Sequence, residues 1–356
     1  MNRIILIGNG FDLAHNLETS YQHFIDWIWK ENNTAYNEHI KSSKDKLVIK
    51  DIIIYVPAFD TVYPIPEQLI NTKPVGDMIL SENQEKWIVR IKYNNLFLKT
   101  ITDRYKQADW VDIEEEYYRL LKNIINNQPS VGFENYSVEN LNRDFKKIQQ
   151  EFEKYLFEKC GHNVTIIKEL QQEIVRDSDN LNKILFLNFN YINTEKIYIE
   201  SILNCTSKFQ QEDLPSIHIH GELGQSNNPI IFGYGDESDS NYSKIEELGG
   251  KYLDYIKQIR YLDTDNYKLL DGFVELDDYQ IFIMGHSCGK SDRTLLKMLF
   301  EHENCQSIKI FRYQREDGTD DFTDKYKNIT RIFSRKLVLR KIVVPKTGTI
   351  LLPQYQ

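Results

Sequence analysis

Cysteine is scarce in this chain of 356 residues, and its few copies lie far apart: Cys160, Cys205, Cys288 and Cys305. No Cys-x-x-Cys pair occurs, which argues against a zinc ribbon, and the wide spacing argues against a disulfide framework. Long apolar runs are also missing, since none approaches the roughly 20 residues of a membrane-spanning helix. No basic and then apolar leader opens the sequence. We therefore expect a cytoplasmic protein that does not enter the membrane.

Basic residues are outnumbered, with 44 Lys and Arg against 53 Asp and Glu, for a net charge of -9. A surface with this balance does not as a whole attract the phosphates of nucleic acids. Nucleic acid is therefore not a favoured partner. The length allows a large core, in one elaborated domain or in two.

Short apolar segments, each followed by glycine or polar residues, predict the strands of a parallel sheet. Four are predicted to be buried strands: Ile4–Ile7, Ile184–Leu187, Ile217–Ile219 and Ile281–Met284. Three more strands are expected at Ile230–Phe232, Ile308–Phe311 and Leu337–Val344. Helical patterns lie between them, as at Thr194–Leu203 and Ser291–Glu301. Such alternation is typical of an α/β domain.

The rest of the chain has a different pattern. Residues 83–180 are charged, rich in helical spacing and poor in glycine and proline, which predicts a helical insertion that we expect to pack over the cleft. Residues 46–82 contain four prolines and predict an irregular connection. The α/β core then comprises residues 1–45 and 181–345, and residues 346–356 form a loose tail.

The first predicted strand ends in the turn Gly8-Asn9-Gly10 and continues into a helix. A glycine turn at a helix N-terminus points backbone N–H groups at an anion and is a common way to hold nucleotide phosphates. The third glycine of the dinucleotide fingerprint is missing, because Leu13 stands at its position. The turn is therefore either a phosphate site or simply a tight connection. Asp12 is either the cap of the helix or a catalytic carboxylate.

Small polar sequences follow all four buried strands, and ligands bind open parallel sheets at the carboxyl ends of their strands. After the first turn, these sequences are Asn188-Phe189-Asn190-Tyr191, His218-Ile219-His220-Gly221 and Gly285-His286-Ser287 with Asp292. The expected convergence of these loops on one cleft is stronger evidence for a site than any single motif.

Each loop also has a plainer interpretation. Asn190 is in position to cap the next helix, and the turn around Ser287 resembles a hydrolase elbow only superficially, because no acid and then histidine follow it. His218 and His220 share a face if both lie on a strand. No cysteine or carboxylate with ligand spacing lies near them, so we expect no metal. Asp112 and Glu114 either meet the dipole of a helix N-terminus or reach the cleft as a general base or ribose ligand.

Together these motifs resemble the AbiH family of bacterial abortive-infection proteins. The matching elements run through the chain in order: Gly8-Asn9-Gly10-Phe11-Asp12-Leu13-Ala14-His15, Thr19-Ser20-Tyr21, Trp110-x-Asp112-x-Glu114, Asn188-Phe189-Asn190-Tyr191-x-Asn193-Thr194, His218-Ile219-His220-Gly221, Phe232-Gly233, Gly285-His286-Ser287 and Ser291-Asp292. This family is in turn similar, more distantly, to the SIR2-like fold, although the zinc module of sirtuins is absent here. The resemblance implies a Rossmann-like parallel sheet of the SIR2/DHS NAD-binding type with a large helical insertion.

The resemblance also implies roles for individual residues. Gly8 and Gly10 would approach a pyrophosphate, Asn190 would position ribose hydroxyls or the attacking water, and His220 would act as the base. We predict the catalytic residues Asp12, Asn190 and His220. The predicted ligand-binding residues are Gly8, Asn9, Gly10, Phe11, His15, Gly285, His286, Ser287 and Asp292. Asp112, Glu114 and His218 are predicted to assist.

The expected function is antiphage hydrolysis of NAD or a related nucleotide, with the nucleotide as substrate and no obligatory cofactor. A phage-derived trigger and a second copy of the chain are the other partners considered. Two alternatives remain at this point. One is a Mg²⁺-dependent nuclease or phosphodiesterase that uses Asp12, Asp112, Glu114 and Asp292. The other is a non-enzymatic sensor that binds a nucleotide.

Overall fold

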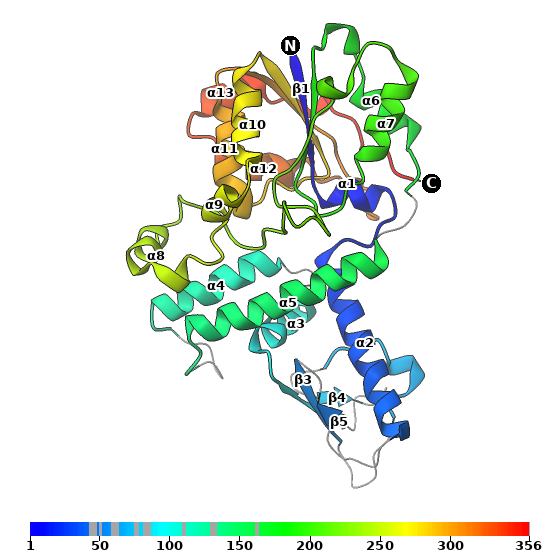
Figure 1. Ribbon diagram of the computed structural model, residues 1–356, viewed down its shortest axis with the longest axis vertical. Helices are drawn as coiled ribbons and strands as arrows, with labels where there is room; N and C mark the ends of the chain where they lie inside the picture. Colours follow the sequence, from blue (N-terminus) through cyan, green and yellow to red (C-terminus); the bar gives the residue numbers. More distant parts are fainter. Residues whose placement is uncertain are drawn as a thin grey trace. The chain divides into compact units, whose positions relative to one another are not determined.

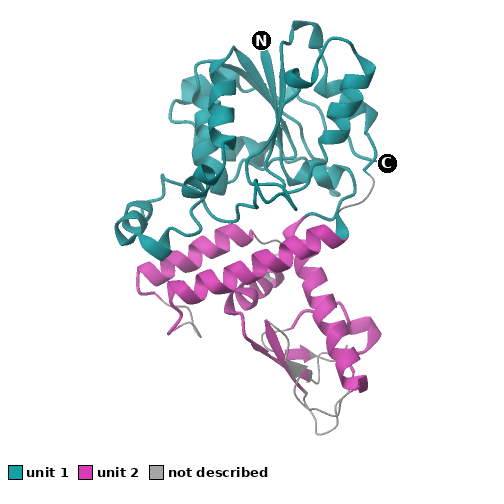
Figure 2. Ribbon diagram, in the orientation of Figure 1, with its two compact units in different colours: residues 1–19, 159–356 teal, residues 20–158 magenta. Residues whose placement is uncertain are grey.

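The computed structural model describes residues 1–42, 48–49, 52–57, 64–74, 78–80, 87–108, 112–128, 134–160 and 164–355. The chain divides into two compact units, shown in Figure 2: unit 1 joins Met1–Thr19 to Lys159–Gln356, and unit 2 is Ser20–Glu158. Residues 20–45, which the sequence analysis placed in the core, thus group with unit 2.

Unit 1 contains a five-stranded parallel sheet in the order β7-β6-β1-β8-β9. Its strands are β1 (Asn2–Ile7), β6 (Ile184–Asn188), β7 (Ser216–His218), β8 (Tyr279–Met284) and β9 (Cys305–Ile310). Counted along the chain, this is the order 3-2-1-4-5 of a Rossmann-like sheet. The order reverses between β1 and β8, and the crevice at the carboxyl ends of such a strand pair is where these sheets bind ligands.

Both faces of this sheet are buried, because successive side chains of each strand point to opposite sides. Ile4 and Leu6 of β1 join one apolar cluster, and Ile5 and Ile7 join the other. Figure 1 shows helices on both sides of the sheet. The helices of the first cluster are α10 (Asn266–Glu275), α11 (Arg293–Glu301), α12 (Phe322–Ile332) and α13 (Lys336–Ile342). Those of the second are α1 (Asn9–Ala14), α6 (Lys168–Ile174) and α7 (Lys196–Cys205).

Short helices fill the connections of unit 1. The long segment between β7 and β8 holds α8 (Tyr242–Leu248) and α9 (Lys257–Arg260). The 3₁₀ turns of the unit are Ser178–Asn180, Gln211–Asp213, Gly250–Tyr252, Tyr261–Asp263, Lys290–Asp292 and Lys346–Gly348.

Unit 2 has an antiparallel sheet in the order β2-β3-β5-β4. Its strands are β2 (Val48–Ile49), β3 (Ile53–Pro57), β4 (Met78–Leu80) and β5 (Trp87–Tyr93), with a 3₁₀ turn at Glu67–Leu69. Its helices are α2 (Tyr21–Ser42), α3 (Leu96–Ala108), α4 (Ile113–Ile125) and α5 (Val138–Lys159). The prediction of an irregular connection over residues 46–82 is therefore wrong for β2, β3 and β4, whose β-branched residues suit a pleated sheet. The helical insertion predicted for residues 83–180 is wrong at both ends, because it begins with strand β5 and its residues from Lys159 on belong to unit 1.

Two predicted strands of unit 1 need correction. The segment Leu337–Val344 is mostly helix α13, because Leu339 and Val343 lie one helical turn apart and both pack in the core cluster of β9. The segment Ile230–Phe232 forms no strand, although all three residues are buried.

The residues after Pro345 are not a loose tail. Leu352 is buried in the core and donates its N–H to the Arg312 carbonyl, and the Tyr355 N–H donates to the Ala14 carbonyl. Backbone hydrogen bonds therefore tie the end of the chain to unit 1.

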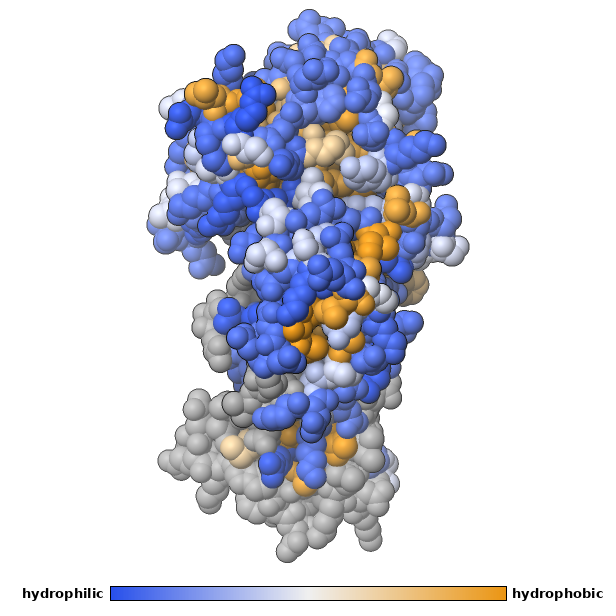
Figure 3. All heavy atoms as spheres, turned by 90° about the vertical axis from the view of Figure 1, so that its left-hand side faces the viewer, coloured by the Kyte–Doolittle hydropathy of each residue, from blue (hydrophilic) through white to orange (hydrophobic). Residues whose placement is uncertain are grey.

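None of the described helices is long and apolar enough to cross a membrane. In the face that Figure 3 presents, hydrophilic residues predominate and apolar residues gather in smaller patches.

Candidate functional site

The turns that follow β1 and β8 pack directly against each other. Ile7 and Gly285 form an isolated bridge, and the Gly10 N–H donates to the Gly285 carbonyl at 2.9 Å. A Cβ atom on Gly285 would stand 2.0 Å from the Phe11 nitrogen, and its φ of +82° also favours glycine. The glycines thus allow two loops to meet at the switch point of the sheet.

The backbone N–H groups of the first turn already have acceptors. Gly8 donates to the Met284 carbonyl, Gly10 to Gly285 and Phe11 to Gly8. These three groups are therefore not turned toward a phosphate. The binding of a pyrophosphate by Gly8 and Gly10 stays a prediction.

Asp12 lies within α1, whose N-cap is Gly8, so the capping interpretation of Asp12 is wrong. Its side chain is 0% exposed, and within the described residues neither carboxyl oxygen has a hydrogen-bond partner of normal geometry. Burial raises the pKa of Asp12 to about 8, although the nearby Thr194 hydroxyl and Asn190 amide act in the opposite direction. An acid in this state retains its proton at neutral pH.

Glu195, at the N-cap of α7, joins the carboxyl end of β6 to that of β7. Its Oε2 accepts a hydrogen bond from Asn188 Nδ2 at 2.7 Å, and its Oε1 lies 2.9 Å from His218 Nε2. Ser216 Oγ also donates to Oε1, at 2.9 Å. Burial opposes the charge of His218, but the hydrogen bond that His218 donates to Glu195 prevails and raises the pKa of His218.

Asn190 is held beside this network. Its backbone N–H donates to Asn188 Oδ1 at 2.8 Å, and its side-chain Nδ2 is buried with no partner in the described chain. Since α7 begins at Lys196, Asn190 does not cap that helix. Its amide is available to a ligand.

Asp292 organises a second polar cluster. Its Oδ1 lies 3.0 Å from Lys257 Nζ and 3.3 Å from His220 Nε2, and its Oδ2 lies 3.5 Å from His286 Nε2. The Cys288 N–H donates to His286 Nδ1, so the proton of a neutral His286 is on Nε2 and faces Asp292. Although burial opposes it, Lys257 holds the pKa of Asp292 well below its usual range.

His220 is held between this cluster and aromatic rings. Its Nε2 also lies 3.1 Å from the Tyr261 hydroxyl, and its ring meets the Phe189 ring edge-on at 5.1 Å between centroids. Burial and the charge of Lys257 lower the pKa of His220 to about 4. The imidazole is therefore neutral at pH near 7.

The two histidines of the His-x-His motif have different partners. The strand β7 ends at His218, so the alternation that would place both rings on one face does not extend to His220. His218 binds Glu195, whereas His220 binds Tyr261 and Asp292. Within the parts of the chain that the structure describes, no group of three His, Cys, Asp or Glu side chains is arranged to hold a metal.

Several predicted ligand-binding residues have structural partners. Phe11 lies in the apolar core, and His15 connects it to α7, with Nδ1 donating to the Phe11 carbonyl and Nε2 accepting from the Tyr198 hydroxyl. Asn9 Nδ2 donates to Thr19 Oγ1 at 2.7 Å. Ser287 is exposed. The ligand contacts predicted for these residues stay predictions.

Asp112 and Glu114 belong to unit 2. Asp112 is the N-cap of α4, and its Oδ1 accepts from the N–H groups of Glu114 and Glu115 at 2.9 and 3.0 Å. The interpretation that Asp112 and Glu114 meet a helix N-terminus thus agrees with the structure. Trp110, which completes this motif, lies outside the described residues.

Sequence reasoning missed several members of the two clusters. Phe189 and Thr194 lie inside the Asn190 motif and Glu195 follows it directly, so their positions were the available signal. Lys257 and Tyr261 lie in the long connection between β7 and β8, where no local pattern marks them. Their roles become visible only through contacts with His220 and Asp292.

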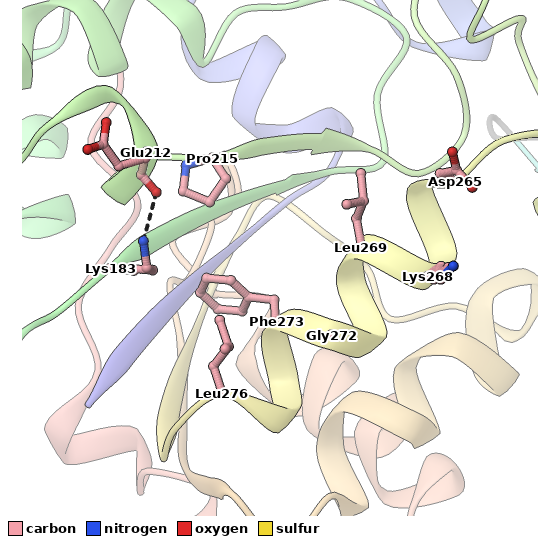
Figure 4. Close-up of a pocket in the computed structure, with 9 residues that line it drawn as sticks. All are labelled: Lys183, Glu212, Pro215, Asp265, Lys268, Leu269, Gly272, Phe273 and Leu276. Carbon is pink, nitrogen blue, oxygen red and sulfur yellow. Dashed lines mark hydrogen bonds between the residues drawn. The ribbon is translucent and has the colours of Figure 1, made fainter.

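A separate, open pocket of about 570 Å³ lies beside α10, near the amino ends of β6 and β7 (Figure 4). Lys183, Pro215, Leu269 and Phe273 are among the residues that line it. The pocket lies at the amino ends of the strands, whereas the two polar clusters lie at their carboxyl ends. It is therefore not part of the candidate site.

Strand order and buried polar groups at the carboxyl ends of β1, β6, β7 and β8 define a Rossmann-like α/β protein with one candidate site at the usual edge of its sheet. The chain matches the family model described as "Bacteriophage abortive infection AbiH" over residues 4–313. It therefore belongs to the AbiH family, which confirms the resemblance drawn from its motifs. Membership of this family indicates a role in abortive infection, a defence of bacteria against phage. A comparison with curated proteins found no match.

Proposed function

We propose that this AbiH protein hydrolyses the N-glycosidic bond of NAD, or of a related nucleotide, during phage defence. The observation that carries the proposal is the connection between the two polar clusters through Phe189 and Asn190. The Phe189 ring contacts the rings of His220 and His286, and the next residue, Asn190, lies beside Asp12. The predicted catalytic residues are thus linked in one region of unit 1.

The fold supports a nucleotide ligand. In a sheet of order 3-2-1-4-5 the strand order reverses between β1 and β8, and Rossmann-like sheets bind dinucleotides at the carboxyl ends of the strands at such a reversal. The SIR2-like character of the cleft is part of the proposal and rests on the motif resemblance.

Hydrolysis of this glycosidic bond needs few catalytic groups. As the bond between ribose C1′ and the positively charged nicotinamide breaks, its electron pair goes to the ring nitrogen and nicotinamide leaves as a neutral molecule. Water then adds to the oxocarbenium-like C1′ and gives up a proton. A neutral His220 is able to accept that proton, and Asn190 is able to orient the water or the ribose.

The test is incubation of the purified protein with NAD, alone and with extract from phage-infected cells, followed by chromatography for nicotinamide and ADP-ribose. We expect His220→Ala and Asn190→Ala to lower turnover at least about 100-fold. His302→Ala is the matched control, because His302 lies at the end of α11 and outside both clusters. No turnover under either condition would contradict the proposal. NAD bound without product would favour a nucleotide sensor instead.

A further inference from the structure

We propose that Asp12 stays the neutral carboxylic acid and donates a hydrogen bond to an uncharged oxygen of the ligand, in a buried site that it shares with Asn190, Thr194 and His218. A sugar hydroxyl or a carboxamide oxygen has the required chemistry. The inference deepens the proposed function and rests on it for the choice of ADP-ribose as the probe.

The first argument is the isolation of the Asp12 carboxyl group. It is fully buried, and no ion pair or hydrogen bond of normal geometry reaches either oxygen from the described residues. An ionised carboxylate without a partner is costly in such a place, and a buried acid avoids the cost by keeping its proton.

The second argument concerns the charged and titratable groups around Asp12. Glu195, from the start of α7, disfavours a second negative charge, and the positive charge that favours ionisation, on His218 of β7, is already paired with Glu195. Cys160, after α5, is a buried thiol whose own pKa burial raises to about 12. At the C-cap of α1, burial lowers the pKa of His15, which keeps its ring neutral. No uncompensated cation among these neighbours stabilises an Asp12 carboxylate.

The third argument is a set of polar atoms that lack acceptors. Asn190 Nδ2, Thr194 Oγ1 and His218 Nδ1 are buried and make no hydrogen bond of normal geometry in the described part of the chain, although the first two lie near the Asp12 carboxyl group. An amide and a hydroxyl donate, and the imidazole donates from Nδ1 when it is protonated, which Glu195 favours. Buried polar groups are nearly always satisfied, so a ligand oxygen or an ordered water is the expected missing partner.

The protonation state can be measured directly by infrared spectroscopy. The difference between wild-type protein and Asp12→Asn should contain the carbonyl band of a protonated acid at pH near 7, and that band should vanish as the pH rises through about 8. Asp236→Asn is the control, since Asp236 is another buried aspartate but has Arg293 Nη1 3.7 Å from its Oδ2. Absence of the acid band from the Asp12 difference spectrum would overturn the proposal.

The ligand contact is tested by calorimetry with ADP-ribose between about pH 6 and pH 9. We expect wild-type affinity to fall about tenfold for each pH unit above the pKa of Asp12, because binding requires one proton. Asp12→Asn, whose amide also donates, should bind as the wild type does near neutral pH and lose this pH dependence. Asp12→Ala should bind at least about tenfold more weakly.

The outcomes separate this inference from the proposed function. Binding of ADP-ribose with the expected pH dependence but no turnover of NAD would overturn only the proposed hydrolysis. An acid band without binding of ADP-ribose would mean that ordered water alone fills the site, and it would overturn the inference. Equal loss of affinity in Asp12→Asn and Asp12→Ala would also overturn it.

Discussion

Gly8 lies so close to His286 that a Cβ atom on Gly8 would stand 2.5 Å from the His286 Cα. The atom in the way belongs to the backbone, so a rotation of a side chain does not relieve the clash. The turns after β1 and β8 therefore fit together only with glycine at this position. The same contact places His286 beside the first turn of the chain.

Gly8→Ala should destabilise the protein by about 1–3 kcal/mol, because one of the two turns must shift. The matched control is Gly272→Ala in α10, where an added Cβ meets nothing within 4 Å. Alanine is the better helix former, so this control should be neutral or stabilise by up to about 1 kcal/mol. Urea unfolding of both variants provides the measurement, and equal midpoints would contradict the close contact.

The buried pair Lys257–Asp292 predicts a strong dependence of each partner on the other. Lys257→Met should cost about 3–5 kcal/mol of unfolding free energy, because it leaves Asp292 buried without its main counter-charge. The double variant Lys257→Met with Asp292→Asn should recover part of this loss. A double-mutant cycle in urea checks the coupling. Additive effects of the two substitutions would mean that the pair is not coupled.

The neutral state of His220 predicts a loss of stability in acid. Burial, with the charge of Lys257, lowers its pKa to about 4 in the folded protein, against 6.5 for an ordinary histidine. Between these values the unfolded chain binds the extra proton, so stability falls as the pH decreases from about 6.5 toward about 4. The full effect is at most about 3 kcal/mol.

Thermal unfolding across this pH range should therefore show a smaller acid loss in His220→Gln than in the wild type. His302→Gln is the control, because His302 lies outside both polar clusters. An unchanged slope in His220→Gln would contradict the lowered pKa of His220.

The end of the chain offers a matched pair of neighbouring leucines. Leu352 is 4% exposed and lies in the core, whereas Leu351 is 40% exposed. Leu352→Ala should cost about 2–5 kcal/mol, and Leu351→Ala should stay within about 0.5 kcal/mol. Guanidinium unfolding of the two variants compares them. A similar cost for both would show that the end of the chain is not docked in the core.

The central strands could be predicted from the sequence because a strand buried on both faces is a short, unbroken apolar run, as in Ile4–Ile7. The same reasoning failed at Leu337–Val344, where two apolar triplets flank Arg340 and Lys341 and most of the segment forms α13. Apolar runs this short do not distinguish the two structures, and the choice follows from which residues meet β9. In unit 2, the prolines of residues 46–82 favoured an irregular connection, so β3 and β4 were not predicted.

The candidate site was predictable where a polar residue follows a strand, as for Asn190 and His220. Lys257 was not, because nothing in its surroundings marks it until the fold brings it 3.0 Å from Asp292. The charge state of Asp12 was equally hidden, since it depends on the absence of a nearby cation rather than on a motif. Contacts between distant segments thus decide the electrostatics of the site.

The insertion of unit 2 between β1 and β6 has a consequence for synthesis of the chain. The central strand β1, with Ile4–Ile7 fully buried in the finished sheet, leaves the ribosome well before its partner β6, which follows roughly 180 residues later. At ordinary translation rates this is a delay of roughly 10–35 seconds. During that time the central strand of unit 1 has no sheet to join, so we expect the yield of folded protein in cells to depend on chaperones that bind nascent chains.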